Sequence, residues 1–231
     1  MTTLSILSGG AAQGLVRALE ADFTRGSGVR LDATFGAVGA MRAKLAGGHP
    51  TDVVILTAAV LAALVGEGVV RAGTLTDLGG VETAIAVREG ERAPAVADAA
   101  GLTAALSGAG AIYFPDPEQA TAGIHFARVI EKLGLAERLR GRLRAFPNGA
   151  TAMAALAQAP EPNPIGCTQV TEILATPGVT LVAPLPPGCD LTTLYTAGVV
   201  TASANPEAAR ALLAHLGAER HAEMRARCGF V

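Results

Sequence analysis

Three short runs of small residues mark points where an apolar segment gives way to a helix-like one. They are Ser-Gly-Gly at 8–10, Gly-Ala-Val-Gly at 36–39 and Ala-Gly at 122–123. The first turn of a helix offers unpaired backbone N–H groups and a partial positive charge, and small side chains let a ligand reach them. One such turn is common in α/β proteins, but three at the ends of strands predict a site for a small anion.

Two side chains could move protons near such a site. His125 follows the third run by two residues, within the first turn of its helix, and an imidazole titrates near neutral pH. Glu172 lies four residues beyond Thr168 and could serve as a base. The alternatives are a structural histidine and a surface carboxylate.

The sequence lacks the motifs of metal-binding, serine-hydrolase and nucleotide-binding sites. His215 and His221 lie in a C-terminal helical region with no carboxylate or cysteine at metal-ligand spacing, so we expect no metal. The sequence has no GxSxG, no phosphate-binding loop and no complete nucleotide fingerprint, and we expect no cofactor.

The composition favours a well-packed globular protein over a disordered one. Half of the 231 residues are hydrophobic, 16% are charged and the net charge is −2. The four arginines within 138–144 alternate along their segment, which is typical of a solvated face, so we expect no nucleic-acid partner. Cys167, Cys189 and Cys228 are an odd number without a CxxC, which favours free thiols, although Cys167 and Cys189 could pair.

The beginning of the sequence bears on localisation. Met1 is followed by an apolar run at 4–7, with no basic segment, leader core or cleavage site before it. No apolar run is long enough to span a bilayer, so we expect no membrane insertion. These features predict a cytoplasmic protein, or a periplasmic one if a leader has been removed.

The alternation of apolar strands and Ala/Leu-rich helices indicates an α/β fold. Strands are predicted at 4–7, 29–35 and 53–56, each followed by a helix, as in a doubly wound sheet. The second half repeats this alternation from 111 onward. The segments 83–87 and 193–200 resemble strands that cross between lobes, so we expect one lobe from 1–86 plus 194–231 and another from 87–193.

Three groups of short motifs follow one another along nearly the whole chain. They are Phe-Gly-Ala-Val-Gly-Ala at 35–40 with Pro-Thr-Asp-Val-Val-Ile at 50–55, Asp-Pro at 116–117 through Thr-Ala-Gly at 121–123 with Lys-Leu-Gly-Leu at 132–135, and Ile-Gly at 165–166 through Gln-Val-Thr-Glu-Ile at 169–173 with Ala-Pro-Leu-Pro at 183–186. Each motif is modest, but in their order and spacing the chain resembles the molybdate-binding family of type II solute-binding proteins, in particular the branch that includes aconitate isomerase.

The resemblance implies a two-lobed type II periplasmic-binding-protein fold with the ligand cleft between the lobes. Ala37 and Val38 depart from the hydroxyl that molybdate binders usually present there, and apolar side chains suit an organic acid better than a tetrahedral oxyanion. The ligand contacts expected from the turns and the resemblance are Ser8, Gly9, Gly36, Ala37, Val38, Ala122, Gly123, Asn148, Thr168 and Gln169.

Two functions remain open at this stage. The first is a cofactor-free isomerase of the aconitate isomerase type, in which His125 and then Glu172 are the candidates for proton transfer and helix N-termini hold the substrate carboxylates. The alternative is a receptor that delivers molybdate or an organic anion to an ABC permease. A cytosolic sensor would need a DNA-binding or partner segment, which the sequence lacks.

Overall fold

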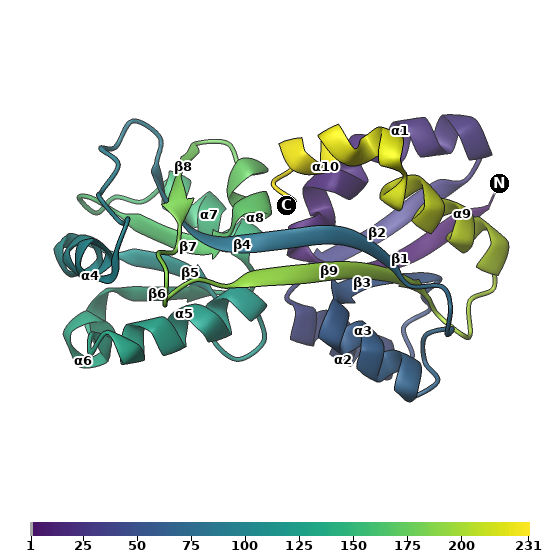
Figure 1. Ribbon diagram of the computed structural model, residues 1–231, viewed down its shortest axis with the longest axis horizontal. Coiled ribbons are helices and arrows are strands. Elements are labelled where there is room, and N and C mark those ends of the chain that lie inside the picture. Colours follow the sequence, from purple (N-terminus) through teal and green to yellow (C-terminus); the bar gives the residue numbers. More distant parts are fainter. Residues whose placement is uncertain (1) are drawn as a thin grey trace. The chain divides into compact units, whose positions relative to one another are not determined.

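The computed structural model describes residues 2–231 and consists of two compact α/β units (Figure 1). The first unit comprises Met1–Val81 and Thr193–Val231, and the second comprises Glu82–Thr192. The chain leaves the first unit within β4 (Thr76–Arg88) and returns to it at the start of β9 (Thr192–Val199). The first unit is therefore built from both ends of the chain.

The first unit has the strand order β2-β1-β3-β9-β4. Its strands β1 (Thr3–Gly9), β2 (Arg30–Gly36) and β3 (Val53–Thr57) are parallel, whereas β9 runs antiparallel to β3. Helices follow the parallel strands because each crossover returns to the same end of the sheet. The helical segments are η1 (Gly10–Ala12), α1 (Gln13–Ser27), α2 (Val38–Ala46), α3 (Ala58–Gly66), α9 (Pro206–Gly217), η3 (Glu219–His221) and α10 (Ala222–Arg227).

The second unit has the strand order β4-β7-β5-β6, with β8 also paired to β4. Strand β5 is parallel to β6 and β7, whereas β4 runs antiparallel to β7 and β8. The segment of four arginines forms the end of α6, η2 and part of β6, where Arg142 Nη1 donates to the carbonyl oxygens of Ser107 and Ala109. The remaining elements are α4 (Ala99–Gly108), β5 (Ile112–Pro115), α5 (Thr121–Lys132), α6 (Ala136–Leu139), η2 (Arg140–Arg142), β6 (Leu143–Phe146), α7 (Gly149–Ala157), β7 (Ile165–Gln169), α8 (Val170–Leu174) and β8 (Val179–Pro184).

Local signals explain several helix boundaries. Asp98 begins α4 by accepting a hydrogen bond from the Gly101 N–H at 2.7 Å, and Asn148 begins α7 as part of a capping box with Thr151. Pro206 occupies the first turn of α9, and Gly28 ends α1 with φ of 71°, a value that favours glycine. These positions fix where the helix ends face.

The cores are aliphatic, as a chain without tryptophan requires. Among the described residues, the first unit has one apolar cluster and the second unit has two. Neighbouring residues of β4 belong to different clusters of the second unit, because Ile85 packs in one and Ala84 and Ala86 pack in the other. Because side chains alternate along a strand, the two clusters lie on opposite faces of that sheet. The second unit is therefore covered by packed side chains on both faces.

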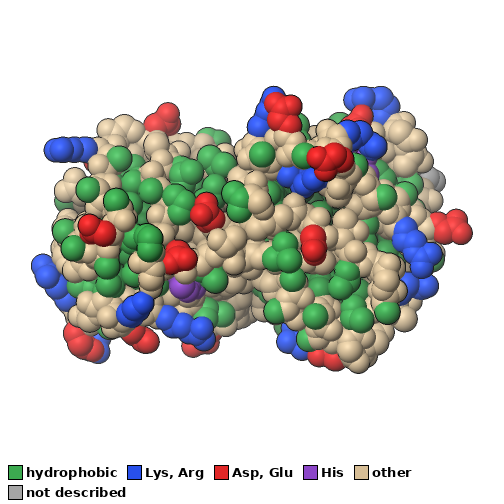
Figure 2. Space-filling view, viewed as in Figure 1, with side chains coloured by type: hydrophobic (Ala, Val, Ile, Leu, Met, Phe, Trp, Pro, Cys, Tyr) green, Lys and Arg blue, Asp and Glu red, His purple; other side chains and the backbone are tan. Residues whose placement is uncertain are grey.

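The surface carries mixed charge. On the face shown in Figure 2, Lys and Arg side chains are interspersed with Asp and Glu rather than gathered into one patch. Within residues 2–231, no helix combines the length and the apolar character needed to cross a membrane. The three cysteines are free, with Cys167 and Cys189 buried and Cys228 half-buried.

Candidate functional site

In the first unit, two of the small-residue turns lie side by side at the carboxyl ends of neighbouring strands. Strands β1 and β2 are in register, so that Ser8 pairs with Phe35 and Gly9 with Gly36. Helices η1 and α2 begin directly after these strands, and no side chain among residues 2–231 caps either N-terminus. Their first-turn N–H groups are therefore available to an anion.

Gly9 allows two larger side chains to approach this turn. A Cβ on Gly9 would lie 3.0 Å from Cε1 of Tyr195 and 3.4 Å from Cγ2 of Val38. Tyr195 belongs to β9, is 2% exposed and was missed by the sequence reasoning. The available signal was its rarity, because it is one of two tyrosines in the chain. Aromatic and apolar surface therefore lies beside the backbone donors.

The predicted contacts of this group are buried and largely apolar. Ala37 and Val38 are 6% and 8% exposed and begin α2, where the backbone is the only source of polar groups. Ser8 is fully buried, and its Oγ donates to the Gly9 carbonyl oxygen at 2.9 Å. A ligand oxygen would have to compete with that carbonyl for the hydroxyl proton. Ligand contact by Ser8, Gly9, Gly36, Ala37 and Val38 stays a prediction.

In the second unit, Glu172 lies within a shell of hydrogen-bond donors. Thr168 Oγ1 donates to Glu172 Oε2 at 2.6 Å, and the backbone N–H groups of Gln169, Gly149 and Ala150 also donate to the carboxylate. Burial raises the pKa of the Glu172 carboxyl above its usual value, although these four donors act in the opposite direction. The side chain is a buried carboxyl rather than a carboxylate on the helix surface.

This arrangement requires a glycine at the start of α7. A Cβ on Gly149 would overlap both the Glu172 carboxylate and Thr168 Oγ1. Asn148 caps the same helix, because its Oδ1 accepts from the Thr151 N–H at 2.9 Å. The first donors of α7 thus bind groups of the protein itself, and ligand contact by Asn148 stays a prediction.

Two buried hydroxyls lie in the same part of the second unit. Thr83 on β4 is paired with Gln169 on β7, and Thr171 follows two residues later on α8. Both are at most 2% exposed, and neither hydroxyl has a hydrogen-bond partner within residues 2–231. An unpaired buried polar group costs about 1–3 kcal/mol, so these hydroxyls favour a bound polar ligand or water there. Neither was among the residues predicted from sequence.

The third small-residue turn serves packing. In α5, a Cβ on Gly123 would lie 2.7 Å from the carbonyl carbon of Asp116, so only glycine lets the helix approach this loop. His125 is the fifth residue of α5, just past the first turn, and its Nε2 donates to the Cys189 carbonyl oxygen at 2.7 Å. No hydrogen bond or ion pair among the residues described joins His125 to Glu172. Ligand contact by Ala122, Gly123, Thr168 and Gln169 is likewise still a prediction.

These features define an α/β protein of the two-lobed solute-binding class, and comparison with known proteins identifies its family. Residues 4–231 match the family described as bacterial extracellular solute-binding protein, and the chain belongs to that family. It is also similar to an aconitate isomerase from Pseudomonas sp., with 31% identity over 228 residues that cover 95% of this chain and 84% of that protein.

Solved structures agree with this assignment at the level of the fold. The periplasmic molybdate-binding protein of Azotobacter vinelandii is similar with a TM-score of 0.81 and 17% identity, covering 99% of this chain and 98% of the other. The sulfate-binding protein SubI of Mycobacterium tuberculosis is similar with a TM-score of 0.78 and 18% identity, covering 100% and 86%. The resemblance to the molybdate-binding family and the two-lobed fold predicted from the sequence are thereby confirmed.

Proposed function

We propose that the protein binds a small di- or tricarboxylate and acts on it as a cofactor-free isomerase of the aconitate isomerase type. The observation that carries this proposal is the buried Glu172 carboxyl, which accepts hydrogen bonds from Thr168 and from backbone N–H groups and whose pKa is raised by burial. A buried carboxyl whose pKa is raised can serve to take up and return a proton, which a binding site alone does not need. The similarity to an aconitate isomerase supports the same choice.

The reaction would be an allylic proton shift. Glu172 removes a proton from the carbon next to the double bond, the electron pair moves across the three-carbon unit, and the proton returns at the far carbon. The charge that develops spreads onto a substrate carboxylate, which backbone N–H groups at helix starts can stabilise. Glu172 takes precedence over His125 in this role, because His125 Nε2 is already bound to the Cys189 carbonyl. His125 is the second candidate.

The groups of the first unit favour an organic anion as substrate. Backbone donors at the starts of η1 and α2 suit carboxylates, and the apolar surfaces of Val38 and Tyr195 suit the carbon skeleton. A tetrahedral oxyanion needs donors on every side, and the side chains of Ala37 and Val38 supply none. We therefore place carboxylates ahead of molybdate.

A receptor of an ABC transporter is the second candidate function, favoured by the family description and by the molybdate- and sulfate-binding relatives. A receptor would need a permease partner and a place outside the cytoplasm. We propose a cytoplasmic location, because three free thiols fit a reducing compartment. Cell fractionation distinguishes the receptor from the isomerase, since a receptor would be recovered outside the cytoplasmic fraction.

The deciding experiment is turnover in deuterated water. Incubation with cis- or trans-aconitate should produce the other isomer with deuterium at the allylic carbon. Nuclear magnetic resonance would detect both the new isomer and the deuterium. Glu172→Gln should slow this by roughly a hundredfold or more, the usual contribution of a positioned acid–base group. Glu223→Gln, an exposed carboxylate on α10, is the matched control and should match the wild type.

Two results would count against the isomerase. If the wild type binds aconitate tightly but neither converts it nor exchanges its protons, the isomerase proposal fails and the receptor function replaces it. If conversion occurs but Glu172→Gln turns over normally while His125→Gln does not, then His125 carries the proton.

A further inference from the structure

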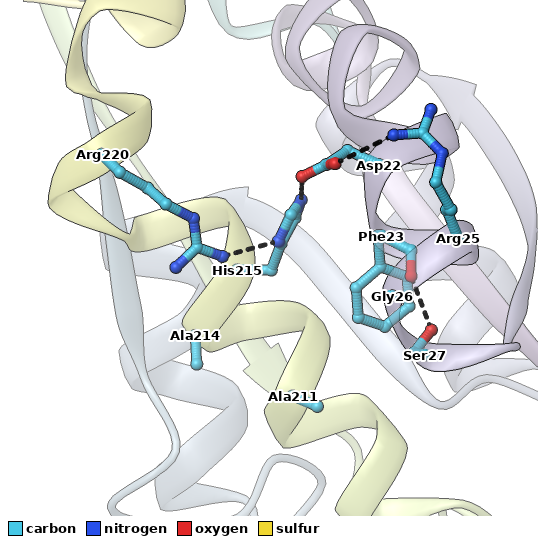
Figure 3. Close-up of a pocket in the computed structure, with 9 residues that line it drawn as sticks. All are labelled: Asp22, Phe23, Arg25, Gly26, Ser27, Ala211, Ala214, His215 and Arg220. Carbon is cyan, nitrogen blue, oxygen red and sulfur yellow. Dashed lines mark hydrogen bonds and ion pairs between the residues drawn. The ribbon is translucent and has the colours of Figure 1, made fainter.

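A surface groove of the first unit is lined by the last turns of α1 and α9 (Figure 3). Its volume is about 530 Å³. His215 lies in the last turn of α9, and a helix C-terminus carries a partial negative charge that favours cations. The groove shares no residue with the groups described above.

His215 is the buried side chain of this groove. It is 8% exposed, and its ring packs against Phe23 with 5.5 Å between the ring centres. Its Nε2 is buried and has no hydrogen-bond partner among residues 2–231. The Leu19 backbone acts in favour of a protonated ring. A buried nitrogen in this position is expected to have a ligand.

Asp22 and His221 face the same point. Asp22 Oδ2 lies 3.9 Å from His215 Nε2, longer than a hydrogen bond, and Figure 3 shows the carboxylate directed at the ring. The His221 ring lies 4.6 Å from the His215 ring. One ligand atom from each of the three residues falls within 4.8 Å of the others.

Arg220 holds both imidazoles from the other side. Its Nη2 donates to His215 Nδ1 and its Nε donates to His221 Nε2, each at 3.2 Å. The guanidinium is exposed and so can leave without disturbing the core. It is a positive charge held beside three groups that prefer a cation.

We propose that Asp22, His215 and His221 form a binding site for a divalent transition-metal ion, best suited to Zn²⁺, from which Arg220 withdraws when the ion binds. Zinc takes imidazole and carboxylate ligands at about 2.0–2.2 Å, which places two ligands of a tetrahedral site about 3.4 Å apart. The pair formed by Asp22 and His215 needs to close by only about half an ångström from 3.9 Å. Water would fill the fourth position.

The electrostatics of the ring agree with this geometry. Burial, followed by the charges of His221 and Arg220, lowers the pKa of His215 below 6.5. This shift favours the neutral ring, which is the form that ligates metals. Asp22 is far in sequence from His215 and His221, which explains why the spacing around the two histidines gave no signal.

The test is Zn²⁺ titration of the untagged, chelator-treated full chain by isothermal calorimetry. The wild type should bind one Zn²⁺ per chain and melt at a higher temperature with it. Asp22→Asn and His221→Gln should each weaken binding at least tenfold; the first is exposed and the second half-buried, so both should fold. Arg220→Met should tighten binding at least threefold, because it removes the competing cation.

His49→Gln is the matched control, because His49 is an exposed histidine of the same unit that contacts the Pro50 carbonyl. It should bind Zn²⁺ as the wild type does. The proposal is overturned if the wild type shows no saturable one-to-one binding, or if Asp22→Asn and His221→Gln bind like the wild type. Weaker binding by Arg220→Met would also overturn it, because the guanidinium would then be helping the ligand.

Discussion

Replacing Gly149 with alanine tests the donor shell around Glu172 most directly. The new Cβ would overlap the Glu172 carboxylate and Thr168 Oγ1, both of which are buried. Overpacking of this kind costs about 1–3 kcal/mol, and losing one hydrogen bond to a charged group adds about 1.5–3 kcal/mol. We expect Gly149→Ala to lower the free energy of unfolding by about 2.5–6 kcal/mol. In a chain of 231 residues this lowers Tm by roughly 10 °C.

Thermal and urea unfolding followed by circular dichroism would measure the effect. Gly66→Ala at the end of α3 is the matched control, because a Cβ there meets no atom within 4 Å. It should be neutral or stabilising by up to about 1 kcal/mol. In a Glu172→Ala background the carboxylate is gone, so Gly149→Ala should cost at least about 1 kcal/mol less. An equal cost in both backgrounds, or a cost below about 1 kcal/mol in the wild type, would refute the reasoning.

Three further predictions follow from buried polar groups. Thr83→Val removes an unpaired buried hydroxyl, so the ligand-free protein should be as stable to urea as the wild type or more stable by up to about 1 kcal/mol. The same substitution should weaken carboxylate binding, measured by calorimetry. Lower stability with unchanged binding contradicts this prediction. The pKa of Tyr113 is raised to about 12, first by burial and then by its hydrogen bond to Glu161, so Glu161→Gln should lower the pH of its ultraviolet titration. The pKa of Glu172 is raised above 4.5 in the folded state, so protonation of this carboxyl stabilises the fold fully below pH 4.5, and this stabilisation is lost as pH rises through the folded-state pKa. The free energy of unfolding of the wild type minus that of Glu172→Gln should therefore fall over that pH range. A difference that does not change with pH contradicts the raised pKa.

The sequence was a good guide to elements whose signals are local. Apolar runs at 4–7 and 53–56 predicted β1 and β3. The short elements α6 and β6 were missed because arginines dominate their segment. There the structure uses Arg142 to bind backbone carbonyls, which charge pattern alone cannot indicate.

The candidate site was harder to predict, because its contacts join distant parts of the chain. A sequence shows Gly149 and Glu172 only as a turn residue and a helix residue. Their contact depends on how α7 and α8 pack beside β7. Similarly, the neighbours of Gly123 in the sequence predict an anion contact, but they give no indication that this glycine packs against the backbone of Asp116. Tertiary packing decides which small residues are near a ligand and which are near the protein itself.

The buried carboxyl of Glu172 also couples binding to the solvent's proton supply. A polyanionic ligand near Thr168 makes a negative charge on Glu172 more costly, so binding raises the affinity of this carboxyl for a proton. By reciprocity, protonation raises the affinity for the ligand by the same factor. Binding in weakly buffered solution is therefore accompanied by proton uptake, and the heat measured depends on the buffer's own ionisation enthalpy. Under the isomerase proposal Glu172 must be ionised to remove the first proton, so proton uptake on binding lowers the fraction of complexes that can begin the reaction.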